Sequence, residues 1–437
     1  MKKTVEHITS VIHLLNEKAE YAVLRNYEGL PDKNKSRDID IIITPESLKK
    51  CEKDILKLIV EGGWKIVTYL KSDRLFTYVC GRCDEDGVEM VQWDFFINTS
   101  VWGLELMSAE EFLKHKAFNG FLYYVGVEAQ FLDKYLYNRT VGAKYPEKYN
   151  ETRIAAQHSP IVEEKLSQLF GKKTVAECDA VKGRGLLKKV IMANLKHPLK
   201  MLGNVASFCY TFVRNYVCSD TGFSIGFTGP DGAGKTTVID MTIESMGDVF
   251  KTAHSYFHFR PTLFGNLGEV AHAAGVKKEV DRNYSDPHRG KKSGTLNSLL
   301  RLFYYSVDYV IGYFLKVKTL TRITKFVIFD RYYTDIICDS RRSCIYLPTK
   351  FLYYFGRLFI PSLNYNILLT ADSDVILDRK RELDKESIEL INSKIDYLAD
   401  KKGYLKVLNN SVPQEAVNKI LSHIFEIQHM QNLKRLS

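Results

Sequence analysis

The chain has 437 residues, of which 45% are hydrophobic and 26% are charged, and its formal net charge is +10 at pH 7. This length exceeds one ordinary domain, and the 26 Tyr and 24 Phe residues exclude an intrinsically disordered chain. The excess of cations favours acidic ligands such as nucleotides, phosphates or an anionic membrane face, and we expect no nucleic-acid partner.

The first twenty residues alternate charged and apolar side chains, which predicts a helix rather than a signal peptide. The eight cysteines are scattered and form no disulfide framework, which fits a reducing compartment. The most apolar stretch, 299–317, is interrupted by Arg301, Asp308 and Lys316, so no membrane span is predicted. We therefore expect a cytoplasmic protein, with peripheral contact at the inner membrane face left open.

Residues 1–165 are predicted to form an α/β domain, because short apolar runs alternate there with turns and a helix. The expected strands are 21–24, 38–43, 64–69, 75–80 and 90–96, the expected helix is 46–61, and residues 108–170 are mostly helical in pattern.

Asp38 and Asp40 stand two apart in one predicted strand, so both side chains leave the same face. Asp94, in another strand, can complete a three-carboxylate cluster suited to Mg²⁺. The arrangement resembles the nucleotidyltransferase fold, in which an Asp-x-Asp pair and a third strand Asp hold the metals. Where that family starts a helix with Gly-Ser, this chain has the segment 24–27, Leu-Arg-Asn-Tyr. Two alternatives stay open: aspartates on an exposed strand face, and a degenerate domain that recognises a substrate.

Residues 166–219 are predicted to be a basic helical connector. No acidic residue lies between Asp179 and Asp220, whereas seven lysines and arginines do, and apolar residues recur beside them at helical spacing. Such a helix can lie on a membrane surface or near phosphates, or it can pack between domains with its lysines in water.

Residues 220–437 alternate strands and helices, which favours a parallel sheet covered by helices on both faces. The run from Gly229 to Thr236 has the pattern G-x-x-x-x-G-K-T and stands between a buried strand, 223–228, and a helix, 237–246. Its glycines let backbone N–H groups point at phosphate oxygens, and its lysine reaches the β- and γ-phosphates of ATP. The predicted ATP-binding residues are Gly229, Asp231, Gly232, Ala233, Gly234, Lys235, Thr236 and Thr237.

A second part of the predicted site follows an apolar strand, 326–329, that ends in Asp330 and Arg331. A carboxylate at the carboxyl end of a strand can hold Mg²⁺, together with the hydroxyl of Thr236. An arginine beside it can neutralise a phosphate.

The loop and the Asp330-Arg331-Tyr332 run resemble thymidylate kinase and its relatives among the nucleoside monophosphate kinases, over roughly residues 220–430. In that family the loop aspartate, here Asp231, faces the acceptor. The arginine of the Asp-Arg-Tyr motif, here Arg331, grips the acceptor phosphate.

Two weaker matches point to further residues of the same family. The segment 258–261, His-Phe-Arg-Pro, resembles its Arg-Glu-Pro segment, which implies that Arg260 lies near the acceptor. Arg379 and Arg381 match the helix leading into the lid, whose arginines close on the transferring phosphoryl group.

After Tyr332 the chain departs from thymidylate kinases, which continue with residues that serve the pyrimidine nucleotide. Here Asp335 and Asp339 stand four apart, on one face if helical, and Arg342 follows. The segment 285–291 and an aromatic helix over 299–314 have no counterpart either. We expect this rebuilt acceptor site, with the two aspartates and Arg342, to take a small molecule or glycan.

The whole layout is similar to proteins labelled thymidylate kinase that accompany surface polysaccharide synthesis, which implies a role in that metabolism. The predicted reaction moves the γ-phosphoryl group of ATP, with Mg²⁺ as cofactor. Two alternatives stay open, a genuine dTMP kinase and an ATP-sensing switch in which turnover is incidental.

Overall fold

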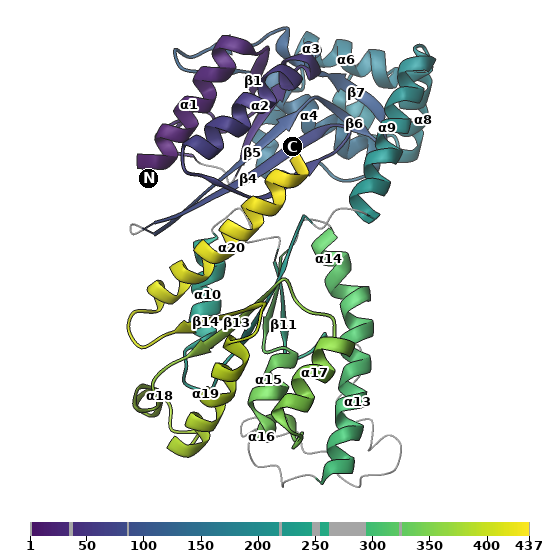
Figure 1. Ribbon diagram of the computed structural model, residues 1–437. Coiled ribbons are helices and arrows are strands. Elements are labelled where there is room, and N and C mark those ends of the chain that lie inside the picture. The colour runs from purple at the N-terminus through teal and green to yellow at the C-terminus, as the bar shows by residue number, and fades with distance from the viewer. Residues whose placement is uncertain are drawn as a thin grey trace. The chain divides into compact units, whose positions relative to one another are not determined.

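The computed structural model describes residues 2–34, 38–84, 87–217, 221–246, 254–261, 294–322 and 326–436. The segment 285–291, singled out in the sequence, lies outside the described residues. The chain divides into two compact units, which Figure 1 shows. The first unit is Met1–Arg82, Glu89–Ser219 and Gln428–Ser437, and the second is Cys83–Val88 and Asp220–Ile427. Both units are mixed α/β, as the sequence predicts.

The first unit is built on a seven-stranded mixed sheet with the order β3-β4-β5-β2-β1-β9-β8. Within it β2 and β5 run parallel, with Asp40 opposite Asp94. The strands are β1 (Tyr21–Val23), β2 (Asp38–Ile43), β3 (Lys65–Lys71), β4 (Leu75–Asp84), β5 (Gly87–Phe96), β8 (Ala117–Phe118) and β9 (Tyr123–Tyr124).

The short strands β8 and β9 interrupt a region that the sequence predicts as mostly helical. They form a hairpin around Asn119 and Gly120, and Gly120 has a φ of +95°. The side chain of Asn119 accepts hydrogen bonds from the backbone N–H groups of Phe121 and Leu122. The turn chemistry of Asn-Gly therefore overrides the helical pattern of the flanking residues.

Alternation along β2 sends its side chains to two different cores. Ile39, Ile41 and Ile43 are fully or almost fully buried in a core formed with α1 (Lys2–Lys18) and α2 (Pro45–Glu61). Ile42 belongs to the core on the opposite face, which contains residues of α4 (Val127–Val141). The same alternation places Asp38 and Asp40 on the α4 side of the sheet.

The remaining elements of the first unit follow β5. The residues predicted as a connector form α7, α8 and α9 there, and Leu186 and Val190 of α8 belong to the core around α4. These elements are β6 (Asn98–Val101), β7 (Leu104–Ser108), α3 (Ala109–Leu113), the 3₁₀ turn η1 (Glu147–Tyr149), α5 (Asn150–Ala156), α6 (Pro160–Phe170), α7 (Val175–Asp179), α8 (Gly183–Asn194) and α9 (Pro198–Val217).

The second unit contains a five-stranded sheet with the order β11-β12-β10-β13-β14, in which each neighbouring pair is parallel. Parallel strands put all their carboxyl ends at one edge, where the connecting loops meet. The strands are β10 (Ser224–Thr228), β11 (His254–His258), β12 (Phe326–Asp330), β13 (Tyr365–Thr370) and β14 (Tyr404–Leu408).

Helices flank this sheet (Figure 1). The core that contains Val327, Phe329 and Leu368 of the sheet is completed by α13, α15, α17 and α19, whereas α10 contacts β10 and β12 outside that core. No helix within the described ranges is both long and apolar enough to cross a membrane. The helices are α10 (Lys235–Ser245), α13 (Thr295–Gly312), a π-helical turn η2 (Tyr313–Val317), α14 (Lys318–Arg322), α15 (Tyr333–Cys338), α16 (Ser340–Ser343), α17 (Thr349–Phe359), α18 (Ser373–Arg379), α19 (Lys385–Ala399) and α20 (Pro413–Leu436).

Candidate functional site

The glycine-rich loop joins β10 to α10, in the strand–loop–helix setting that its pattern requires. Gly232 and Gly234 have φ values of +86° and +83°, which favour glycine. A Cβ on Gly234 would also lie 2.6 Å from Nδ2 of Asn409, which donates to the carbonyl oxygen of Ala233 at 2.9 Å. The loop therefore presents its backbone at the N-terminus of α10, where the helix dipole favours an anion.

Lys235 is the buried cation of this loop. Its side chain is 6% exposed, and Nζ donates to the carbonyl oxygens of Gly229 and Pro230 at 2.8 Å each. Burial, together with the positive charge of Arg331, lowers the pKa of Lys235 to about 8. An anion beside Nζ would relieve both effects, because it favours the charged form of the amine.

Asp330 ends β12, next to the strand that leads into the loop. The residue is 7% exposed, and its Oδ2 accepts a hydrogen bond from the Tyr256 hydroxyl at 2.9 Å. Its other oxygen, Oδ1, is buried and has no hydrogen-bond partner in the described part of the chain. Burying a carboxylate oxygen without a hydrogen-bond partner lowers stability. Such an oxygen is a suitable ligand for a hard cation such as Mg²⁺.

Arg331 lies between two carboxylates and is 3% exposed. Its Nη2 lies 2.5 Å from Oδ1 of Asp231, and its Nη1 lies 2.7 Å from Oδ1 of Asp335. The backbone of Arg331 has a φ of +76°, a conformation that costs a non-glycine residue about 1–3 kcal/mol. Such strain concentrates at functional sites, where the surrounding structure holds it in place.

Arg342 approaches the same loop aspartate from α16. Its Nη2 pairs with Oδ2 of Asp231, and its Nε lies 3.6 Å from Oδ2 of Asp339. Asp339 also accepts a hydrogen bond from the backbone N–H of Arg342 at 3.1 Å, which caps α16. Asp231 thus links two arginines that come from different elements.

These groups surround a cavity of about 560 Å³ at the carboxyl edge of the sheet. Five lysine or arginine side chains and three acidic side chains line it, a net charge of +2 without His258. The lining residues are Asp231, Gly232, Gly234, Lys235, Thr236, Thr237, His258, Asp330, Arg331, Arg342, Arg379, Lys380 and Glu382.

Several predicted acceptor residues lie outside this lining. Arg260 is 3% exposed and pairs through Nη1 with Oδ2 of Asp308 at 3.0 Å. Asp335 and Asp339 stand behind the cavity, where they hold Arg331 and Arg342. They do not share one helical face, because α15 ends at Cys338 and Asp339 begins the next helix.

The two predicted lid arginines differ in position. Arg379 lines the cavity and donates through Nη1 to the carbonyl oxygen of Asn409 at 2.8 Å, whereas Arg381 is exposed and does not line it. His258, Lys380 and Glu382 also line the cavity and were not predicted. His258 lies opposite Asp330 in the pairing of β11 with β12, a register that the sequence pattern does not contain.

The loop after β10, the parallel strand order and the flanking helices decide the architecture of this unit. The second unit has a P-loop kinase-like fold. No protein-family model matches the chain, and no curated protein matches it. Among solved structures, a thymidylate kinase from Ehrlichia chaffeensis is similar over 46% of this chain and 98% of its own, with 15% identity and a TM-score of 0.32. At this TM-score the likeness carries no argument about the fold or the residues of this chain.

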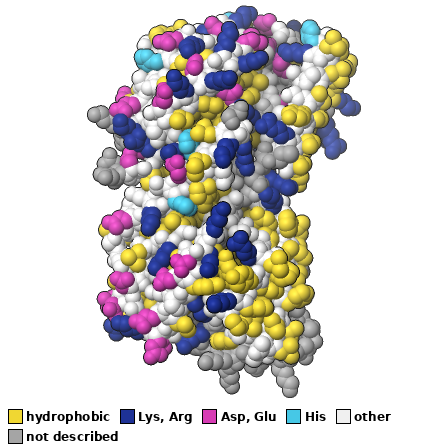
Figure 2. All heavy atoms as spheres, viewed as in Figure 1, with side chains coloured by type: hydrophobic (Ala, Val, Ile, Leu, Met, Phe, Trp, Pro, Cys, Tyr) yellow, Lys and Arg dark blue, Asp and Glu magenta, His cyan; other side chains and the backbone are white. Residues whose placement is uncertain are grey.

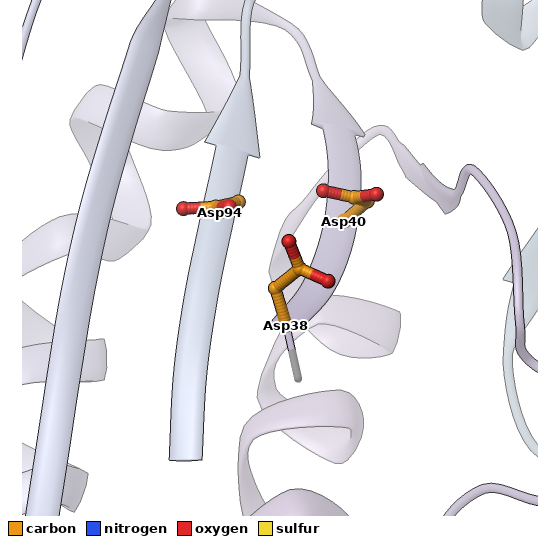
Figure 3. Close-up of side chains that lie close together, drawn as sticks. All are labelled: Asp38, Asp40 and Asp94. Carbon is orange, nitrogen blue, oxygen red and sulfur yellow. The ribbon is translucent and has the colours of Figure 1, made fainter. Parts of the chain in front are cut away.

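The first unit contains a separate group of carboxylates. Asp38 and Asp40 project from β2 toward Asp94 on β5 (Figure 3), and one oxygen of each lies within 4.8 Å of the others. Buried Arg25 donates through Nε to Oδ2 of Asp40 at 2.6 Å and through Nη1 to Oδ2 of Asp133 at 3.1 Å. A guanidinium thus occupies one side of the cluster.

Asp94 is the carboxylate most affected by its surroundings. Burial, and after it the charge of Asp40, raises the pKa of Asp94 to about 7, although Thr77 and Gln92 both donate to it. Burial also raises the pKa of Asp40. Crowded, desolvated carboxylates of this kind favour a cation that neutralises them.

Proposed function

We propose that the second unit is an ATP-dependent phosphotransferase. The observation that carries the proposal concerns Asp330, which lines the same cavity as Lys235 and Thr236. Its Oδ1 is buried and has no hydrogen-bond partner among the described residues. A carboxylate, a hydroxyl and an ammonium around a glycine-rich loop are the groups that Mg²⁺ and a triphosphate require.

The residues that line the cavity have different roles in the proposed reaction. When bound by Thr236 and Asp330, Mg²⁺ would neutralise charge on the phosphates. Lys235 would stabilise negative charge on the transferring phosphoryl group, and Arg331 and Arg379, which line the same cavity, would add to this effect. Little covalent chemistry is required of the protein, so we assign no nucleophile.

We further propose that the acceptor is a hydroxyl group of a small molecule or glycan. Asp231 lines the cavity, and a carboxylate can accept the hydrogen bond of an attacking hydroxyl. Both arginines beside it are already paired with aspartates. The ion-pair network of Lys235, Arg331 and Arg342 with Asp231, Asp335 and Asp339 carries no net charge, so these three cations offer a dianionic phosphate acceptor little attraction. A role in surface polysaccharide metabolism rests on the resemblance of the layout alone.

An acceptor screen tests this proposal. We expect ADP release that depends on a sugar or glycan hydroxyl, and slow or no release with dTMP. Efficient turnover of dTMP, with kcat/KM of about 10⁴ M⁻¹s⁻¹ or above, would restore the thymidylate kinase alternative. Steady ADP release that no acceptor stimulates would favour the ATP-sensing switch.

For the first unit we propose a divalent-cation site formed by Asp38, Asp40 and Asp94. The convergence of their oxygens supports it, whereas nucleotidyl transfer has no further support from the residues around them. Calorimetry with Mn²⁺ and Mg²⁺ tests it, with the Asp38→Asn/Asp40→Asn variant as the matched control. Equal heats for the wild type and this variant would make the unit a degenerate domain.

A further inference from the structure

Helix α9 presents an apolar face to solvent along its length, and Phe212, on another side of the helix, is also 59% exposed. No residue of this 20-residue helix is buried. Met201 and Val205 rest on the core of the first unit, on the side opposite the exposed face. The exposed face recurs at helical spacing, with exposures of 85% for Leu199, 62% for Leu202, 66% for Tyr210, 56% for Val213 and 60% for Val217.

The chain segment that contains this face is basic. The segment between Asp179 and Asp220 contains seven lysines and arginines and no carboxylate. Lys200 pairs with Glu105 at 2.7 Å. The described residues provide no ion pair for the other six, which are Lys182, Arg184, Lys188, Lys189, Lys196 and Arg214. Figure 2 shows apolar and basic side chains side by side on the part of the first unit that holds α8 and α9.

An exposed tryptophan adjoins the helix. Trp102 forms the turn between β6 and β7 and is 54% exposed, whereas Trp64 and Trp93 are 1% and 0% exposed. Gly103 in the same turn lies so close to α9 that a Cβ there would be 2.7 Å from the carbonyl oxygen of Asn204. Trp102 therefore stands at the edge of α9, and tryptophan is the residue that favours the boundary between apolar and aqueous phases.

We propose that α9, with Trp102 and the cations of α8, docks the first unit on an anionic lipid bilayer. The helix would lie in the plane of the interface, with its apolar face among the acyl chains and its lysines near the lipid phosphates. Unpaired cations around an exposed apolar stripe match both chemical features of such a surface. The proposal concerns the first unit and does not depend on phosphoryl transfer in the second.

The test uses the full chain with vesicles of phosphatidylcholine alone and of an equal mixture with phosphatidylglycerol. We expect co-sedimentation with the mixed vesicles that weakens at high salt, and a blue shift of tryptophan emission. Trp102→Phe is expected to lose the shift and keep the co-sedimentation, because the other two tryptophans are buried.

Variants separate the two components of the surface. Leu199→Glu/Val213→Glu is expected to weaken vesicle binding at least about tenfold, because both side chains would insert among the lipids. Replacing Lys188, Lys189 and Lys196 by Gln is expected to weaken it on the order of a hundredfold. Leu358→Glu on α17 is the matched control, since Leu358 is 75% exposed on the other unit, and it is expected to bind like the wild type.

Three outcomes would overturn the proposal. The first is equal binding to both kinds of vesicle, and the second is equal loss of binding in the Leu358→Glu control. The third is a dimer in the absence of lipid, seen by analytical ultracentrifugation, that Leu199→Glu/Val213→Glu dissociates. That result would show that a second copy of the chain covers α9.

Discussion

Asp231 receives Arg331 on one carboxylate oxygen, at 2.5 Å from Nη2 to Oδ1, and Arg342 on the other. The loop, the end of β12 and α16 are therefore joined through one side chain. Asp231 also lines the cavity, so in the proposed reaction the two arginines would fix the direction of the carboxylate that meets the acceptor.

Asp231→Asn tests that role. We expect kcat to fall about 10²–10⁴-fold, because an amide cannot take a proton from the attacking hydroxyl, while the affinity for ATP changes little. Steady-state ADP release and calorimetry with ATP measure the two effects. Asp374→Asn, on the exposed surface of α18, is the control and should behave like the wild type. A loss of ATP affinity as large as the loss of kcat would assign Asp231 to nucleotide binding instead.

The lowered pKa of Lys235 predicts proton uptake when ATP binds. With a pKa of about 8, Lys235 is uncharged in about half of the molecules at pH 8, and a bound triphosphate favours its charged form. Binding at pH 8 should therefore take up about half a proton, whereas at pH 6.5 the lysine is already charged and uptake should vanish. Calorimetry in two buffers with different ionisation enthalpies measures it. Lys235→Arg should show no uptake at either pH, and equal heats for the wild type in both buffers at pH 8 would contradict the assignment.

Gly234→Ala is expected to damage the loop. The new Cβ would lie 2.6 Å from Nδ2 of Asn409, and a φ of +83° costs alanine about 1–2 kcal/mol. We expect the affinity for ATP, measured by calorimetry, to fall at least about tenfold. Gly203→Ala on exposed α9 is the matched control, because nothing lies within 4 Å of its Cβ. The control should keep the affinity, and a Gly234→Ala protein that binds ATP equally well would exclude this loop as the phosphate site.

Arg25→Met should reveal how the guanidinium and a divalent cation compete in the first unit. The change leaves Asp40 and Asp133 buried without their cation, which is expected to lower the free energy of unfolding by about 3–5 kcal/mol. Mn²⁺ should raise the free energy of unfolding of Arg25→Met by more than it raises that of the wild type. Urea denaturation followed by tryptophan fluorescence reports on this unit, which holds all three tryptophans. Lys18→Met, which breaks an exposed pair with Asp54, should change little, and a Mn²⁺ effect equal in wild type and Arg25→Met would argue against a shared site.

The glycine-rich loop and Asp330 could be predicted from the sequence, because each of these features is formed by contiguous residues at the end of one strand. The partners of these residues could not, because they come from distant parts of the chain. Arg342 and Asp231 are 111 residues apart, and Arg25 and Asp133 are 108 apart. Only tertiary packing decides which carboxylate meets which arginine.

Tertiary packing also explains why the predicted acceptor residues lie outside the cavity lining. The four-residue spacing of Asp335 and Asp339 predicted two carboxylates open to a ligand, but they are 1% and 7% exposed and paired with arginines. Near β11 the sequence pointed to Arg260, and the cavity is lined by His258 instead. Side-chain direction at the end of a strand depends on register, which no local pattern contained.

Acceptor-dependent ADP release by the wild type and by Lys235→Ala tests the account most directly. We expect the wild type to release ADP in proportion to a hydroxyl-bearing acceptor found in the screen. Lys235→Ala, folded by circular dichroism, should lose at least about 10²-fold in kcat, because the lysine holds charge at the phosphoryl group. Wild-type turnover in a folded Lys235→Ala protein would contradict the assignment of this cavity as the site of phosphoryl transfer.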